Sequence, residues 1–281
     1  MSEQSATALP LQGKRILVTR TRQQASALSE RLAALGAIPI EFPTIRIVPP
    51  QDWESLDNAL KRLCSTAVDH PHYAWLVFTS ANGVNICLER LHSIGYEARA
   101  IRNVRIAAIG PATAATLARY GVTADLVPNQ YIAEGVAAAL IEDARQRGES
   151  LQGKRILLAR AAEARKALAT ELQKAGAIVD EVTAYHTVAV AHNDEQSLNV
   201  VRLLQTHQLD MVTFTSSSTV RYFMQWFTGC DAERGTSPKI ACIGPITSQT
   251  ARELGLHVDI EAEEFTIDGL VEAIVEYEEK S

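Results

Sequence analysis

Two short stretches of the chain contain residue types that can bind an anion. Each places a glycine and a proline before small residues and a hydroxyl: Gly110-Pro111-Ala112-Thr113 and Gly244-Pro245-Ile246-Thr247. Glycine permits a sharp turn, and proline suits the first position of a helix, where no backbone N–H is needed. The free N–H groups of the first helical turn then attract negative charge. We therefore predict that Gly110, Thr113, Gly244 and Thr247 bind an anionic ligand.

Two other polar turns follow apolar segments whose sequences match each other. Ser80 and Asn82 come after Trp75-Leu76-Val77-Phe78, and Ser216 and Ser218 come at the same places after Met211-Val212-Thr213-Phe214. Ser and Asn cap helices well and leave further first-turn N–H groups available to a ligand. We predict that these four residues also bind the ligand, although each hydroxyl could instead do no more than cap its helix.

Two arginines, Arg20 and Arg160, end segments of nearly identical sequence. A guanidinium group at such a place can form charge-assisted hydrogen bonds with a carboxylate of a ligand. The alternative is a structural arginine that forms a salt bridge at the edge of a sheet. The residues alone leave both possibilities open, and we predict both arginines as ligand-binding residues.

The elements that position these residues occur twice. Gly13-Lys14-Arg15-Ile16-Leu17-Val18-Thr19-Arg20 predicts a turn and a buried strand, and it returns 140 residues later as Gly153-Lys154-Arg155-Ile156-Leu157-Leu158-Ala159-Arg160. In the first copy a helix over residues 23–35 ends at Gly36, and a second strand follows; in the second copy the helix ends at Gly176. The chain therefore contains an internal duplication.

Each half contains about four strand-helix units, the last of them near residues 125–136 and 258–270. Alternating strands and helices of this kind form parallel sheets that are covered on both faces, with ligands at the carboxyl ends of the strands. We expect two similar flavodoxin-like or Rossmann-like α/β domains. Extended segments near residues 43–50 and 183–191 could pair as a two-stranded linker and act as a hinge when ligand binds.

Composition excludes several classes of partner and cofactor. The chain has 281 residues, 47% of them hydrophobic, a net charge of −6 and no long basic block. We therefore expect no nucleic-acid partner and no membrane partner. The first dozen residues contain neither a basic start nor an apolar core, and no apolar run approaches about 18 residues, so we expect a cytoplasmic protein, and we also expect a monomer.

No cofactor or metal is expected. The four cysteines (Cys64, Cys87, Cys230 and Cys242) lack CxxC spacing and are typical of reduced thiols, and we interpret His70 and His72 as solvated. The chain has neither GxSxG for a serine hydrolase nor GxGxxG or GxxxxGK[ST] for a nucleotide site.

From Ile16 to Ile274 the chain resembles the uroporphyrinogen-III synthase family. The order and spacing of several short motifs carry the resemblance. They are Thr19-Arg20, Phe78-Thr79-Ser80-Ala81-Asn82-Gly83-Val84, both Ile-Gly-Pro turns, Tyr185 with Thr187, Thr215-Ser216-Ser217-Ser218 and Thr266-Ile267-Asp268-Gly269-Leu270.

The resemblance implies a cofactor-free lyase that acts on the linear tetrapyrrole hydroxymethylbilane. It would close this substrate to uroporphyrinogen III with inversion of ring D and loss of water, in haem, sirohaem and cobalamin biosynthesis. It also changes the expected domain limits, because a simple duplication would divide the chain near Gly148. The family pattern joins residues 1–42 to 191–281, makes 48–183 the second domain and leaves 43–47 and 184–190 as linkers.

The resemblance also selects Tyr185 as the catalytic candidate, although a tyrosine in a linker strand is more often structural. A phenol with a pKa of about 10 stays protonated at neutral pH and can act as an acid on the leaving hydroxyl group. Because the substrate also cyclises unaided, the main task of the protein is expected to be control of substrate conformation. The alternative function is a non-catalytic, hinged two-domain protein that binds a small anion.

Overall fold

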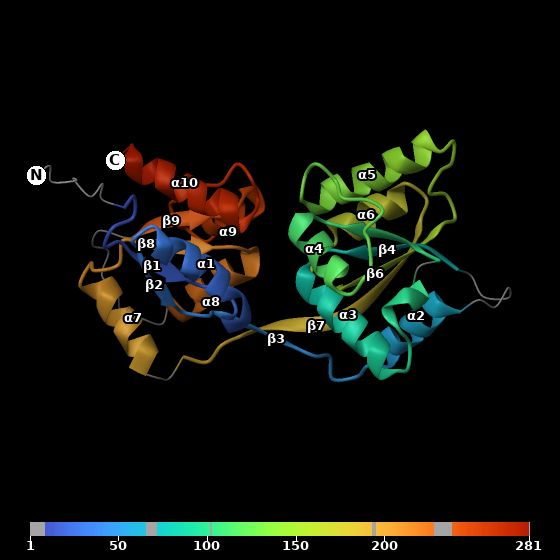
Figure 1. Cartoon of the computed structure of the whole chain (residues 1–281), viewed down its shortest axis with the longest axis horizontal. Helices are drawn as coiled ribbons and strands as arrows, with labels where there is room; N and C mark the ends of the chain where they lie inside the picture. Colours follow the sequence, from blue (N-terminus) through green and yellow to red (C-terminus); the bar gives the residue numbers. More distant parts are fainter. Residues whose placement is uncertain (1–8, 66–71, 102, 193–194, 228–237, 281) are drawn as a thin grey trace, which may run out of the picture. The chain divides into compact units, whose positions relative to one another are not determined.

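A computed structural model describes residues 9–65, 72–101, 103–192, 195–227 and 238–280 of the chain (Figure 1). The chain divides into two compact units. The first unit contains residues 1–46 and 188–281, and the second unit contains residues 47–187. The expected linkers at 43–47 and 184–190 contain both points of division, and their limits stay a prediction.

The first unit is built around a five-stranded sheet in the order β10-β9-β8-β1-β2, in which neighbouring strands are parallel. Its elements are β1 (Arg15–Val18), α1 (Arg22–Ala34), β2 (Ile38–Glu41), α7 (Glu195–Gln205), β8 (Met211–Phe214), α8 (Ser217–Phe227), β9 (Lys239–Cys242), α9 (Pro245–Glu253), β10 (Ile260–Glu261) and α10 (Ile267–Glu279).

The second unit has a sheet in the order β3-β7-β6-β4-β5, in which β7, β6, β4 and β5 run parallel. Its elements are β3 (Ile45–Val48), α2 (Glu54–Cys64), β4 (Tyr73–Phe78), α3 (Ala81–Ser93), η1 (Ala98–Ile101), β5 (Arg105–Ala108), α4 (Pro111–Arg119), α5 (Ala133–Gln146), β6 (Arg155–Ala161), α6 (Ala167–Lys174) and β7 (Ile178–Ala189). Strands β3 and β7 each contain a point where the chain passes from one unit to the other.

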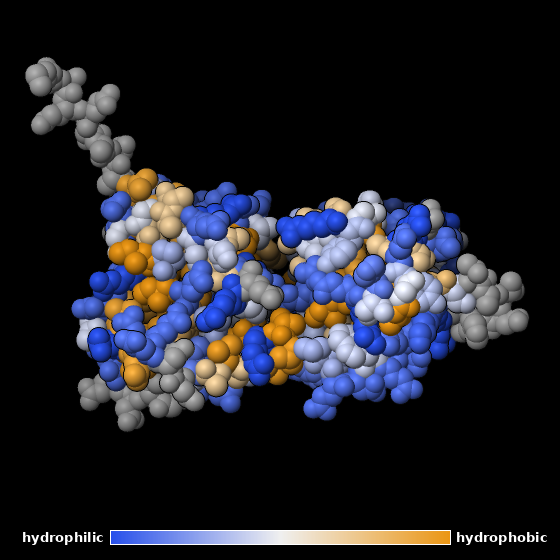
Figure 2. All heavy atoms as spheres, turned by 60° about the horizontal axis from the view of Figure 1, so that its bottom comes forward, coloured by the Kyte–Doolittle hydropathy of each residue, from blue (hydrophilic) through white to orange (hydrophobic). Residues whose placement is uncertain are grey.

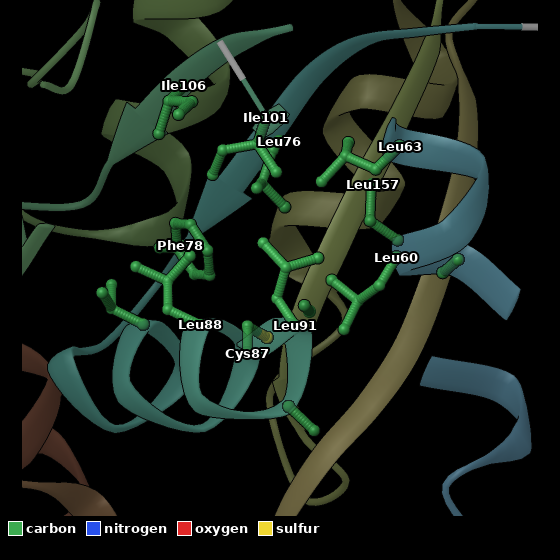
Figure 3. Packing of buried hydrophobic residues seen from close by; sticks show 14 of the residues in the cluster. Leu60, Leu63, Leu76, Phe78, Cys87, Leu88, Leu91, Ile101, Ile106 and Leu157 are labelled. Atoms are coloured by element: carbon green, nitrogen blue, oxygen red, sulfur yellow. The ribbon is translucent and has the colours of Figure 1, made fainter. Parts of the chain in front are cut away.

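Helices cover both faces of each sheet, because successive strand residues point to opposite sides. In the first unit Ile16 and Val18 pack toward α1 and α10, whereas Leu17 packs toward α7, α8 and α9. In the second unit α2, α3 and α4 cover one face and α5 and α6 the other. Figure 3 shows Phe78 and Leu76 of β4 against Cys87, Leu88 and Leu91 of α3.

The two units form equivalent backbone hydrogen bonds at corresponding positions of the duplication. Gly13 N donates to Gly36 O at 2.9 Å, and Gly153 N donates to Gly176 O at the same distance. The register agrees as well, since Val18 lies opposite Glu41 and Leu158 lies opposite Glu181. A residue of the first unit in this region therefore corresponds to the residue 140 positions later.

Strand β2 forms one edge of the first sheet and contains Pro39. The N–H groups of Ile38 and Phe42 donate to Lys14 O and Val18 O. Backbone N–H groups alternate in direction along a strand, so the nitrogen of Pro39 faces the open edge, where it has no hydrogen to donate.

The sequence patterns did not predict two helices. These are α2, which lies between β3 and β4, and α7, which lies between β7 and β8. The spacing of Leu56, Leu60 and Leu63 on one face of α2 is the signal that could have located the first of them.

Figure 2 shows hydrophobic and hydrophilic residues interspersed on the visible surface of each unit. No helix among the described residues is long and apolar enough to cross a membrane.

Candidate functional site

The predicted residues collect at the carboxyl edge of their own sheet. In the first unit Gly244 and Thr247 follow β9, Ser216 and Ser218 follow β8, and Arg20 follows β1, and these three strands are neighbours. In the second unit the same edge receives the corresponding groups from β5, β4, β6 and β7. The carboxyl edge of a parallel sheet is where α/β proteins bind ligands.

Helix α9 begins as the sequence predicts. Pro245 occupies its first position, Gly244 is its N-cap without a side-chain cap, and Thr247 is buried. Among the described residues, the N–H groups of Ile246 and Thr247 donate to no acceptor within the protein. These donors, together with the positive end of the helix, form a site for a carboxylate.

Helix α4 of the second unit has the same start. Gly110 is the N-cap, Pro111 follows it, and Thr113 is buried. The N–H groups of Thr113 and Ala114 donate to Gly110 O at 3.1 and 3.0 Å, so the first turn is closed more tightly than in α9. The Ala112 N–H has no acceptor among the described residues.

Both glycines lie under an aromatic ring that the sequence reasoning missed. A Cβ atom on Gly244 would lie 2.8 Å from the Phe265 ring, and one on Gly110 would lie 3.1 Å from the Tyr131 ring. Both backbones are extended, with φ of 167° and −170°, so any residue could adopt these conformations. The nearby ring is therefore the reason that these two positions require glycine. The sequence feature that could have revealed these contacts is an aromatic residue at the same place in each half, Tyr131 and Phe265.

Alanine at Gly244 is expected to destabilise the protein more than alanine at Gly110. The Phe265 ring must move to admit the new methyl group, and overpacking of this kind costs about 1–3 kcal/mol, whereas the longer contact at Tyr131 needs less movement. Urea denaturation of Gly244→Ala, with Gly110→Ala as the matched control, measures the difference. Equal midpoints for the two variants would contradict this explanation.

The serine turn before α8 is held by its own hydrogen bonds. Ser216 Oγ lies 3.0 Å from Ser218 Oγ and accepts from Thr219 N at 3.3 Å, as a helix cap does. Ser217 Oγ accepts from Thr250 Oγ1 at 2.8 Å, which connects this turn to α9. Ser216 and Ser218 therefore at least cap and order the turn, and their contact with a ligand stays a prediction.

Tyr185 is buried in the second unit, where β7 pairs with β6. Its hydroxyl lies 2.9 Å from Ser80 Oγ, and Ser80 caps α3 by accepting from Gly83 N at 3.0 Å. Burial raises the pKa of Tyr185, against the opposing effect of hydrogen bonds from Ser80 and Asn82. The phenol is therefore protonated at neutral pH and can donate a proton.

The two predicted arginines differ in their surroundings. Arg160 is buried, and its guanidinium donates to Glu181 and to Arg165 O. By contrast, the Arg20 guanidinium has no hydrogen-bond or ion-pair partner among the described residues, and its Nε is fully buried. Burial lowers the pKa of Arg20, although an arginine remains charged at neutral pH.

Glu163 is a further residue that the sequence patterns do not predict. Its carboxylate lies 3.0 Å from His186 Nδ1 and accepts from Thr187 N at 3.0 Å, beside Tyr185 in the chain. It fixes the strand that carries Tyr185. No pattern in the sequence marks it, because it lies in the turn after β6 and meets β7 only in the folded unit.

The described residues contain no group of three or more His, Cys, Asp or Glu side chains that could hold a metal ion. Cys87 and Cys242 are buried and Cys64 is partly buried. Burial raises the pKa of the Cys87 thiol to about 12 and that of Cys64 to about 11. Cys230 and His70 lie outside the described residues, and His72 is exposed.

Comparison with known proteins agrees with this architecture. The family model described as uroporphyrinogen-III synthase HemD matches residues 26–272. A uroporphyrinogen-III synthase from Synechococcus elongatus is 38% identical over 275 residues, which cover 95% of this chain and 97% of that protein. A uroporphyrinogen-III synthase from Chlorobaculum parvum is 28% identical and covers 94% of this chain and 98% of that protein.

Solved structures show the same fold. A mutant uroporphyrinogen III synthase from Thermus thermophilus aligns with a TM-score of 0.64 and 16% identity, over 96% of this chain and 100% of that chain. A uroporphyrinogen-III synthetase from Helicobacter pylori aligns with a TM-score of 0.58 and 18% identity, over 94% and 99% of the two chains.

Proposed function

The chain belongs to the uroporphyrinogen-III synthase family, the cyclising lyases of tetrapyrrole synthesis, and on that premise we propose how its residues perform the reaction. Its substrate is a small-molecule tetrapyrrole. The observation that carries this function is the 38% identity to a synthase over nearly the whole of both chains. The alternative of a non-catalytic anion-binding protein is not favoured.

We propose that hydroxymethylbilane binds through its carboxylates to donors at the carboxyl edges of both sheets. The N-termini of α9 and α4 supply backbone N–H groups beside Thr247 and Thr113. Other donors come from the remaining predicted residues, Arg20, Ser80, Asn82, Gly110, Arg160, Ser216, Ser218 and Gly244. A charge-assisted hydrogen bond contributes about 1.5–3 kcal/mol, so a few good contacts are sufficient for micromolar binding. Arg160 contributes less to this set, since Glu181 already neutralises it.

We propose that Tyr185 is the general acid. The phenol donates its proton to the substrate hydroxyl as the C–O bond breaks, and water leaves. The electron pair for this step comes from the adjacent pyrrole, and ring closure later releases a proton that restores the phenol. The Ser80 hydroxyl, 2.9 Å from the phenol oxygen, stabilises the phenolate that forms in between.

We further propose a cytoplasmic monomer that needs no metal or organic cofactor and binds neither nucleic acid nor membrane. The net charge of −6 without a basic block supports the absence of polyanionic partners. Light scattering after size-exclusion chromatography tests the monomer, and a dimer mass would contradict it.

The function is tested by supplying hydroxymethylbilane to the purified protein in the presence and absence of EDTA. The expected product, resolved as porphyrin isomers after oxidation, is the isomer with ring D inverted, at equal rates with and without the chelator. Formation of only the symmetric isomer at the spontaneous rate would overturn the proposed function. Activity lost to EDTA and restored by a metal would overturn the cofactor-free mechanism alone.

A further inference from the structure

The duplicated Arg and Glu residues form an ion pair in the second unit but not in the first. Arg20 corresponds to Arg160, and Glu41 corresponds to Glu181, 140 residues later in each case. The strand register confirms the equivalence, because Glu41 lies opposite Val18 and Glu181 opposite Leu158. Glu181 nonetheless pairs with Arg160, whereas Glu41 does not pair with Arg20.

The residue that separates the two cases is Ser29 on α1. Ser29 is buried, and its Oγ donates to Glu41 Oε1 at 2.9 Å. The equivalent position on α6 is Ala169, which lies in the apolar core and has no hydroxyl to offer Glu181. Glu181 therefore pairs with Arg160 without a competing hydroxyl from the helix, whereas the Glu41 carboxylate accepts a hydrogen bond from Ser29.

An unpaired guanidinium with a fully buried Nε is an unusual feature, since buried charges are normally paired. Arg20 lies at the carboxyl edge of its sheet, next to the turn after β8, where α/β proteins bind ligands. Burial without a partner makes the charge unfavourable in the free protein and therefore available to an incoming anion. Its planar donors match the geometry of a carboxylate.

We propose that Ser29 keeps the Arg20 guanidinium available to a substrate carboxylate by forming a hydrogen bond with Glu41. The first unit then binds a substrate carboxylate through the charge of Arg20, whereas in the second unit Glu181 neutralises the corresponding charge of Arg160. This inference rests on the proposed function for the identity of the substrate. Ser29 and Glu41 are positioning residues, and Arg20 is the group that contacts the carboxylate.

The test uses uroporphyrin III, the oxidised product with the same carboxylates, as the probe. Its dissociation constant is measured by quenching of protein fluorescence for wild type, Arg20→Gln, Ser29→Ala, Glu41→Gln and the double variant Ser29→Ala/Glu41→Gln. Circular dichroism and thermal unfolding confirm that each variant is folded. Glu41→Gln is the matched control, because an amide keeps the bond to Ser29 and cannot neutralise Arg20.

Arg20→Gln is expected to weaken binding about tenfold or more, as the loss of a charge-assisted bond does. Ser29→Ala is expected to weaken it about threefold or more, because Glu41 becomes free to pair with Arg20 as Glu181 pairs with Arg160. The double variant should bind like wild type, since its residue 41 carries no charge. A purely structural role for Ser29 would leave the double variant as weak as the single one.

The proposal is overturned if Arg20→Gln binds like wild type, if Ser29→Ala does, or if the second substitution fails to restore binding. Failure of the proposed function gives a different result. In that case the wild-type protein forms no inverted isomer from hydroxymethylbilane, whereas the order of affinities for the carboxylate probe still reports on Arg20.

Discussion

Replacement of Tyr185 by Phe is expected to lower the turnover number by about 10²–10⁴-fold, the range typical of general acid catalysis, with little change in product affinity. The substitution removes the hydroxyl and its hydrogen bonds with Ser80 and Asn82, and the ring keeps its packing in the core. The measurement is the rate and isomer ratio at saturating substrate, corrected for spontaneous cyclisation. A wild-type rate with only the inverted isomer would remove Tyr185 from the chemistry.

Tyr73 offers a matched control for this experiment. It is also a buried tyrosine of the second unit, and its hydroxyl donates to Asp180 Oδ2 at 2.7 Å. It lies at the amino end of β4, the edge opposite to the site. Tyr73→Phe should lose stability through that hydrogen bond and keep its turnover, so a comparable fall in both variants would point to unfolding instead of chemistry.

The pH dependence of turnover provides a second readout for Tyr185. Burial raises the pKa of the phenol, so its proton is present at neutral pH and is lost only above the ordinary value of about 10. The step that depends on this acid should therefore be independent of pH through the neutral range and should decline only in strong alkali. The Phe variant should show no such alkaline decline.

Glu181→Ala is expected to lower the free energy of unfolding by about 2 kcal/mol, within the range for a hydrogen bond to a charged group, because Arg160 is buried whereas Glu181 is exposed. Among the residues that the structure describes, the substitution leaves the buried guanidinium of Arg160 with Arg165 O as its one acceptor. Burial alone would raise the pKa of Glu181, but the hydrogen bond and charge of Arg160 lower it overall. The stabilisation is thus complete above the ordinary glutamate pKa and is lost as the pH falls through the lowered one.

Glu41→Ala is the matched control for this stability measurement, because it removes the corresponding carboxylate of the first unit. Glu41 accepts from Ser29 and holds no charged partner among the described residues, so its loss should cost only about 1 kcal/mol. Urea denaturation of both variants at neutral pH gives the comparison. Equal losses would show that the Arg160 pair adds nothing to stability beyond an ordinary hydrogen bond.

The architecture could be predicted from the sequence because the repeated segments specify the same local structures twice. The helix expected over residues 23–35 is α1, Arg22–Ala34, and the two Gly-Pro turns begin α4 and α9. The last strand of each half was less predictable. It is reduced to the two residues of β10 in the first unit and to a single bridge at Leu126 in the second, since so few apolar residues define it.

In the candidate site, the starts of the helices could be predicted from the sequence, whereas the hydrogen-bond partners of the side chains could not. Glycine, proline and small residues determine how α4 and α9 begin, and these preferences are local. The different fates of Arg20 and Arg160 depend on one hydroxyl, Ser29 against Ala169, on a helix that meets the strand only in the folded unit. The sequence predicts that Tyr185 lies in a linker strand, but it does not predict that the Tyr185 hydroxyl contacts Ser80.

The proline in β2 bears on how the protein behaves at high concentration. An open sheet edge invites a strand of another molecule to extend the ladder, which is a common origin of aggregation. Pro39 takes away one of the N–H groups that such an intruding strand would need, midway along a strand of only four residues. Since Ile38 beside it is exposed, the missing N–H makes this edge of the first sheet less able to pair with a strand of another molecule.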